Sequence, residues 1–74
     1  MKLIDLLNAV EGSTVIRIAE SRASDGAFLG HAEDAAVNVK GEMLFGDVTE
    51  IYGETYRAYG RPGISILVKP YESK

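Results

Sequence analysis

The residues Thr14-Val15-Ile16-Arg17-Ile18-Ala19-Glu20 decide the fold of this 74-residue chain. The stretch holds three β-branched apolar residues, and Arg17 interrupts them. This pattern fits a pleated, mostly buried strand better than one face of a helix. We therefore expect an interior strand here, with an amphipathic helix before it, a hairpin after it, and two apolar runs downstream as its partners.

The segments on either side carry helix and hairpin signals. Apolar residues recur at helical spacing over residues 3–10, which predicts a short helix with its leucines facing the sheet. Gly12 is placed where a helix can end in a left-handed residue. After the strand, the polar run 21–26 ends in Asp-Gly, a hairpin or loop signal, and residues 27–30 read as a short returning strand.

The middle of the chain is more ambiguous. Glu33 and Asp34 stand before good helix formers, which favours a short helix over residues 31–37, although residues 36–39 could equally be extended. The apolar residues Met43, Leu44 and Phe45 follow between two glycines. These three side chains must be covered by the fold or form a contact surface.

The last third predicts a second hairpin. Residues 47–52 read as a strand that continues to residue 59, with a bulge at Gly53. In the sequence Gly60-Arg61-Pro62-Gly63, Pro62 presets one dihedral angle and Gly63 supplies a positive one, as in a type II turn. Residues 64–68 then alternate as a returning strand that ends at Pro70.

These elements predict an α+β fold. We expect one small domain over residues 1–70 and a frayed tail at 71–74, in the order helix, strand, strand, short helix, strand, strand. The four strands should form one mostly antiparallel sheet, with the N-terminal helix and the short second helix on a single face.

Composition and charge narrow the function. There is no cysteine for a disulfide or thiolate metal site, and no apolar run approaches the length of a membrane span. We expect a cytoplasmic protein that does not insert into membranes. The net charge of −3 disfavours binding to nucleic acid. The charge is uneven, because residues 1–50 hold nine acids against four Lys and Arg, whereas residues 51–74 hold two acids against four.

No pattern for catalysis or metal binding is complete. His31-Ala32-Glu33 matches the first half of a zinc deaminase signature, but that site also requires cysteines. The chain has several serines, one histidine and no nucleophile elbow. Gly60 and Gly63 have the spacing of a KH-domain loop, but that loop joins two helices. We therefore expect no catalytic residue, no metal and no cofactor.

The second hairpin is the remaining candidate surface. Tyrosines and arginines together can anchor a protein interface or stack single-stranded bases, and the tyrosines can also simply fill a strand. The residues concerned are Tyr52, Tyr56, Arg57, Tyr59 and Arg61.

Several short motifs resemble the small accessory proteins encoded in phages, prophages and mobile elements of Gram-positive bacteria. They are the opening Leu-Ile-Asp-Leu-Leu, the strand Val-Ile-Arg-Ile, the segment Gly-His-Ala-Glu-Asp-Ala, and the closing Val-x-x-Ile and Ile-x-Ile-x-Val. The resemblance implies a regulatory or host-interaction role without catalysis, and it transfers no functional residue.

Three functional hypotheses follow. The first is a non-catalytic interaction module that binds a protein partner, including itself as a homodimer through an exposed strand edge or through Met43, Leu44 and Phe45. Residues 64–68 carry few of the charges that protect an exposed edge. The second is weak binding of single-stranded nucleic acid by the Tyr and Arg hairpin. The third is an acidic decoy for a host nuclease, which would use Asp25, Glu33, Asp34, Glu42 and Asp47.

Overall fold

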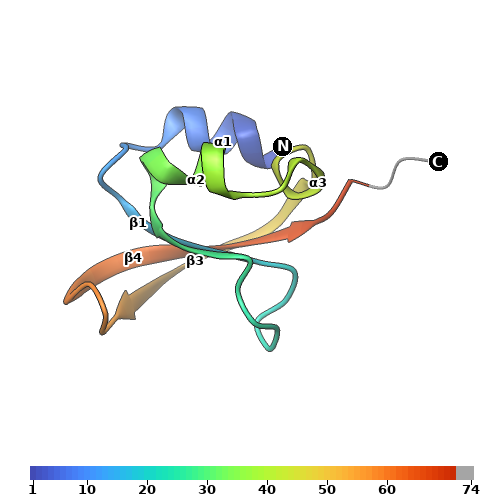
Figure 1. Cartoon of the computed structure of the whole chain (residues 1–74). Coiled ribbons are helices and arrows are strands. Elements are labelled where there is room, and N and C mark those ends of the chain that lie inside the picture. The colour runs from blue at the N-terminus through green and yellow to red at the C-terminus, as the bar shows by residue number, and fades with distance from the viewer. Residues whose placement is uncertain (72–74) are drawn as a thin grey trace.

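The computed structural model describes residues 1–71, in which three helices cover one face of a four-stranded sheet (Figure 1). The α+β class predicted from the sequence is confirmed. The elements along the chain are α1 (Leu3–Ala9), β1 (Val15–Ala19), β2 (Phe28–His31), α2 (Ala32–Asn38), α3 (Gly41–Leu44), β3 (Asp47–Tyr56) and β4 (Arg61–Lys69).

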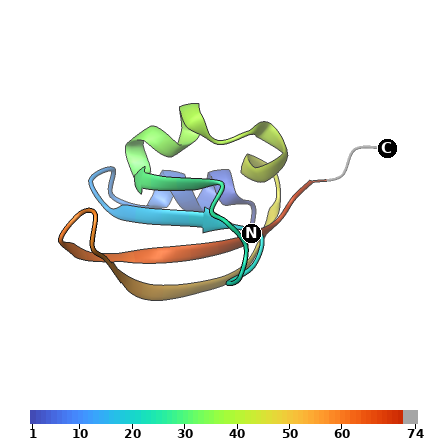
Figure 2. The same cartoon turned by 60° about the horizontal axis from the view of Figure 1, so that its bottom comes forward.

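The strand order in the sheet is β2-β1-β4-β3 (Figure 2). Strand β1 is interior, as expected, and pairs antiparallel with β2 and parallel with β4. Strand β4 pairs antiparallel with β3. The sheet is therefore mixed, because the two predicted hairpins meet through a parallel pair at its centre. Strand β4 is also interior, so the expectation that residues 64–68 form an exposed edge is wrong.

The hydrophobic core lies between the helices and one face of the sheet. Ile16 and Ile18 of β1 and Ile66 of β4 are fully buried there. The helices contribute Leu3 and Ala35, which are also fully buried. Alternation along the strands sends these isoleucines to the helix side and their neighbours to the opposite face, which we call the open face.

Helix α2 confirms the helical alternative for the middle of the chain, and α3 is a short extra helix that the sequence did not predict. Met43 and Leu44 on α3 are buried in the core. These two residues are therefore unavailable as a contact surface. Among the three apolar residues proposed for that surface, Phe45 alone is exposed, with half of its area open to solvent.

The second hairpin has a different turn and a different bulge from those predicted. The positive φ of 63° belongs to Gly60, and β4 already begins at Arg61. Pro62 pairs with Thr55 of β3, and β1 pairs with β4 only from Ile64 onward, so the proline removes no hydrogen bond between β4 and β1. Gly53 pairs regularly with Ile64, and the register shifts at Thr49. The predicted left-handed end at Gly12 is also wrong, since Gly60 has the only positive φ among the described glycines.

The C-terminal end is held at Tyr71, whose amide donates to the carbonyl of Glu42 at 2.7 Å. The Nζ atom of Lys2 also lies 5.7 Å from the centre of the Tyr71 ring. Tyr71, the last described residue of the tail predicted at 71–74, thus makes two contacts with the rest of the fold. The rest of that tail, residues 72–74, lies outside the described residues.

Candidate functional site

The outer side of β3 is the candidate site. Strand β3 is the last strand of the sheet, and its start is covered by the N-terminal residues. Lys2 forms an antiparallel bridge with Asp47, and the amide of Val48 donates to the carbonyl of Met1 at 2.8 Å. Among residues 1–71, no other segment pairs with this side of β3. The outer side of residues 49–56, which we call the free edge, therefore keeps its outward backbone groups available.

The free edge lies beyond the cover of the helices, because the second hairpin extends past them (Figure 1). Ile51 shows the effect most clearly. It pairs with the fully buried Ile66 and points to the same face of the sheet, yet 47% of Ile51 is exposed. The helices cover β1 and β4 but leave this part of β3 uncovered, so an apolar side chain stands beside unpaired backbone.

The side chains of β3 give the edge little protection. Natural edge strands are commonly guarded by Lys, by Pro or by bulges that twist the edge away. Strand β3 contains no Lys, Arg or Pro, and its single register shift lies at Thr49, near the covered start. The free edge carries only Glu50 and Glu54 as charged residues. An arriving strand would therefore meet negative charge but no positively charged side chain on the edge itself.

The loop between β1 and β2 contacts the open face beside the free edge. Arg22 of this loop lies over the Tyr52 ring, 3.8 Å from its centre, and its guanidinium is 2.7 Å from Glu50 Oε2. Arg17 donates to the carbonyl of Ser24 at 2.5 Å and ties the loop to β1. Arg22 and Glu50 are largely exposed, so we expect this ion pair to add little stability. It places one positive charge next to the free edge.

A series of side-chain hydrogen bonds that runs from the buried Tyr56 and Ser65 to the exposed Glu54 supports the same part of β3. The Tyr56 hydroxyl bonds to Ser65 Oγ, and Ser65 Oγ donates to Glu54 Oε2 at 2.8 Å. Since Ser65 has one hydroxyl proton and gives it to Glu54, Tyr56 is the donor to Ser65. Tyr56 and Ser65 are both buried. These hydrogen bonds fix the end of β3 against β4, and within residues 1–71 no buried side-chain nitrogen or oxygen lacks a hydrogen-bond partner.

This arrangement predicts that the Tyr56 phenol loses its proton at a higher pH than an ordinary tyrosine. Burial raises the pKa of the Tyr56 phenol above its ordinary value of 10.0, and the negative charge of Glu54 acts in the same direction. A Ser65 hydroxyl reoriented toward the phenolate would offset part of the rise. Above pH 10.0 the folded state thus holds a proton that the unfolded chain releases, so the free energy of unfolding falls as the pH rises through the raised pKa.

The measurement is the difference in tyrosinate absorbance between the wild type and Tyr56→Phe during alkaline titration. We expect the pH midpoint of this absorbance difference to be higher in the folded protein than in the protein unfolded in urea. Coinciding midpoints would contradict a buried, hydrogen-bonded Tyr56.

The other predicted hairpin residues lie at or near its tip. Tyr59 packs edge-on against His31 with a ring-centre distance of 5.4 Å, and its hydroxyl donates to the carbonyl of Leu29 at 3.4 Å. Arg61 donates to the carbonyl of Ser13. Arg57 is exposed. The structure therefore places Tyr52 and Tyr56 beside the free edge, while Tyr59 and Arg61 anchor the tip to other parts of the fold.

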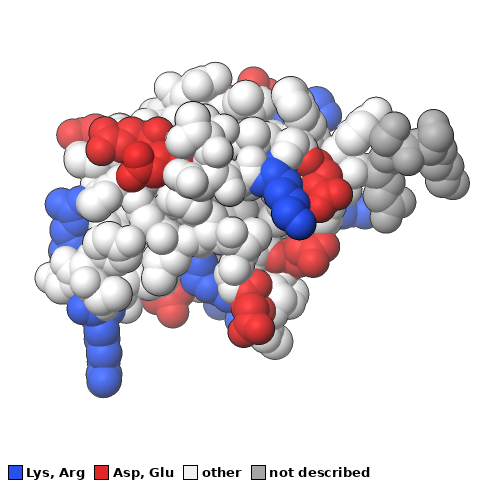
Figure 3. All heavy atoms as spheres, viewed as in Figure 1, with Lys and Arg blue, Asp and Glu red and all other residues white. Residues whose placement is uncertain are grey.

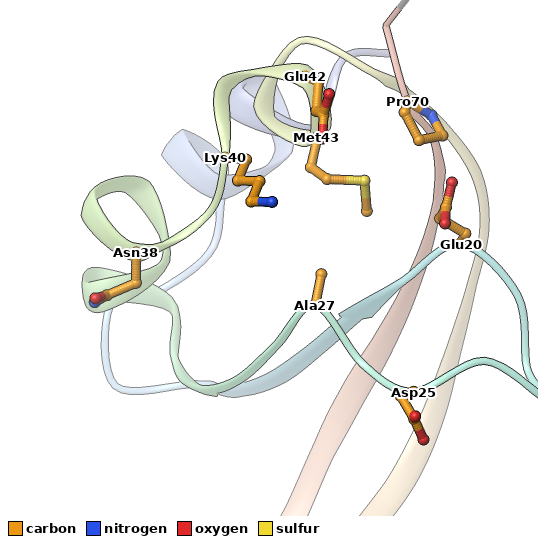
Figure 4. Close-up of a pocket in the computed structure, with 8 residues that line it drawn as sticks. All are labelled: Glu20, Asp25, Ala27, Asn38, Lys40, Glu42, Met43 and Pro70. Carbon is orange, nitrogen blue, oxygen red and sulfur yellow. The ribbon is translucent and has the colours of Figure 1, made fainter.

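A cavity of about 300 Å³ lies between the β1–β2 loop, the segment from the end of α2 to α3, and the end of β4 (Figure 4). It is lined by Glu20, Asp25, Ala27, Asn38, Lys40, Glu42, Met43 and Pro70. Met43 points into it, whereas Asp25 and Asn38 point away. Among the described residues, no three His, Asp or Glu side chains are grouped as metal ligands would be. The cavity combines a partly apolar wall with carboxylates that do not converge.

The charged residues on the face drawn in Figure 3 form separate patches, with acidic and basic groups interspersed. The acids named for the decoy hypothesis are divided between the β1–β2 loop, the start of α2, α3 and the start of β3. Within residues 1–71, each helix is too short or too polar to cross a membrane.

Two features of the site were missed from the sequence. The pairing of Met1 and Lys2 with β3 limits the free edge, and Arg22 reaches Tyr52 across thirty positions of the chain. No local pattern indicates either contact.

Comparison of the chain with protein-family models, with curated proteins and with solved structures found no match.

Proposed function

We propose that this protein is a non-catalytic protein-interaction module whose contact element is the free edge of β3. The observation that carries the proposal is the free edge itself. Its eight residues include no Lys, Arg or Pro, and one of them is the half-exposed Ile51. An extended segment of a partner can add to such an edge as a further strand. Main-chain hydrogen bonds then supply affinity, and alternate side chains supply specificity.

The remaining features of the chain accord with this role. The absence of cysteine suits a reducing compartment, and we place the protein in the cytoplasm. The resemblance to accessory proteins of phages and mobile elements suggests a host or phage protein as the partner. The proposed contact requires no cofactor or metal.

The two alternatives have weaker support. Stacking of single-stranded bases needs accessible aromatic faces. Arg22 occupies the Tyr52 ring, Tyr56 is buried, and Tyr59 contacts His31. A decoy for a nuclease would need acids gathered on one surface, whereas the acids named for that role lie on separate elements.

The test is a charge placed on the edge. Ile51→Lys adds a positive charge beside the unpaired backbone, and we expect it to abolish capture of the partner from the native host because Lys is the charged side chain that most commonly guards natural edge strands. Val37→Lys is the matched control. It introduces the same charge at the 82% exposed Val37 on α2, and we expect it to retain the partner.

Capture and affinity should be measured with the purified partner, and the circular dichroism of both variants should match the wild type. Binding that survives Ile51→Lys, or that is lost equally in Val37→Lys, would contradict an interaction through β3.

A further inference from the structure

We propose that the free edge pairs with a second copy of the chain, so that two β3 strands run antiparallel with Gly53 opposite Gly53 on a two-fold axis. This inference rests on the proposed function, because it uses the same edge and names its partner. The dimer would join two four-stranded sheets into one eight-stranded sheet.

The length of the free edge selects the register. Met1 and Lys2 occupy the row beside Asp47 and Val48, so an added strand must end before it reaches them. At the other end, β3 stops at Tyr56 and the chain turns. In a symmetric antiparallel pair centred on Gly53, residues 50–56 of one copy lie opposite residues 56–50 of the other. This register uses almost the whole free edge and meets the N-terminal residues of neither copy.

The faces of the two sheets match in this register. Alternate residues of β3 point to the open face, because each of them is paired with a β4 residue that points to the same face. They are Glu50, Tyr52, Glu54 and Tyr56. A centre on Gly53 places Glu50 opposite Tyr56 of the second copy and Tyr52 opposite its Glu54. The open faces of the two sheets then form one continuous surface.

Charge complementarity favours this register over its neighbour. A centre on Tyr52 would place Glu50 directly opposite Glu54 of the second copy, twice in each dimer, and like charges directly opposite destabilise a sheet. With the centre on Gly53, Glu54 of each copy instead approaches the Tyr52 ring of the other copy, over which Arg22 lies. Arg22 already pairs with Glu50, so it would stand between carboxylates from both copies. The positive charge next to the edge thus attracts the acids of a second edge.

The helix side of the edge is also compatible. Ile51 lies opposite Thr55 of the second copy, a pair of β-branched residues of the kind that stabilises cross-strand contacts. This pairing would cover part of the exposed Ile51 side chain. At the axis, no atom of the described residues lies within 4 Å of a Cβ added to Gly53, so a side chain introduced there has room on its face of the sheet.

The absence of cysteine makes the register directly testable by crosslinking. We expect Gly53→Cys to form a disulfide-linked dimer on mild oxidation, because directly opposite Cα atoms lie about 4.5–5.5 Å apart, within the range that a disulfide bridges. Ile51→Cys is the matched control. In the same register its two copies are four residues apart along the strand, about 13 Å, and we expect no crosslink.

Sedimentation equilibrium of the wild-type protein completes the test. We expect a reversible dimer that Thr55→Lys returns to monomer, with unchanged circular dichroism. Strictly monomeric wild type, or a crosslink through Ile51→Cys in place of Gly53→Cys, would overturn the self-pairing. A monomer whose binding to a different protein is still lost in Ile51→Lys would overturn the dimer and leave the proposed function standing.

Discussion

Replacing Gly63 by alanine is expected to destabilise the fold by about 2–3 kcal/mol, as overpacking at a closed site does. A Cβ at this position would overlap the carbonyl oxygen of Val15 on the neighbouring strand and would lie 3.0 Å from the Tyr56 ring. The backbone of β1 cannot move away without disturbing its parallel pairing with β4. The variant therefore tests whether these two strands are adjacent at the centre of the sheet.

Gly53→Ala is the control for this substitution. Gly53 lies on the adjacent strand of the same hairpin, and its added Cβ would meet no atom of residues 1–71 within 4 Å. We expect its effect on the free energy of unfolding to be within about 0.5–1 kcal/mol. Urea unfolding followed by circular dichroism measures both variants. Equal stabilities for the two would show that β1 does not approach Gly63.

Ile66→Ala is expected to have the largest effect on stability, a loss of about 3–4 kcal/mol. Ile66 is fully buried between the sheet and the helices, so truncation removes favourable burial and leaves a cavity. A domain of this size has a total stability on the order of 5–10 kcal/mol. Much of that stability would be lost, and the urea midpoint should fall accordingly at a similar m value.

Its matched control is Ile51→Ala, which removes the same atoms from the residue paired with Ile66. Because 47% of Ile51 is exposed in the single chain, we expect a loss of about 1 kcal/mol or less at concentrations where the protein is monomeric. Similar losses at both positions would mean that the helices cover β3 as fully as β4, which would remove the basis for a free edge.

The sequence was informative where the signal was local. The β-branched run around Arg17 predicted an interior strand, and β1 is interior. Helical spacing in residues 3–10 predicted α1, and the two acids before good helix formers predicted α2. Both hairpins were predicted as well. Each of these features depends on residues a few positions apart, whose periodicity and turn chemistry can be read directly.

The sheet order could not be predicted because it depends on a distant contact. The parallel pairing of Ile16 with Ile64 joins residues 48 positions apart, and hairpin signals identify only strands that are consecutive in the chain. The prediction of an exposed edge at residues 64–68 was wrong for this reason. The low charge of that segment reflects its interior position, because β1 and β3 flank it on both sides.

The candidate site was predicted only in part. The hairpin was correctly identified as a place to look for a surface, but its tyrosines are mostly engaged within the fold. The free edge itself is made of backbone groups, which no sequence motif distinguishes. Its limits depend on where Met1 and Lys2 lie, and that position is set by the packing of α1 and α3 against the sheet.

Amide hydrogen exchange along β3, measured by NMR at low and at high protein concentration and with any captured partner added, tests the role of the free edge most directly. We expect the outward amides between Glu50 and Tyr56 to exchange freely in the dilute protein and to become protected on association, while the exchange of the α2 amides stays unchanged. Outward β3 amides that remain equally exposed in the associated state, with protection arising on another element, would contradict that role.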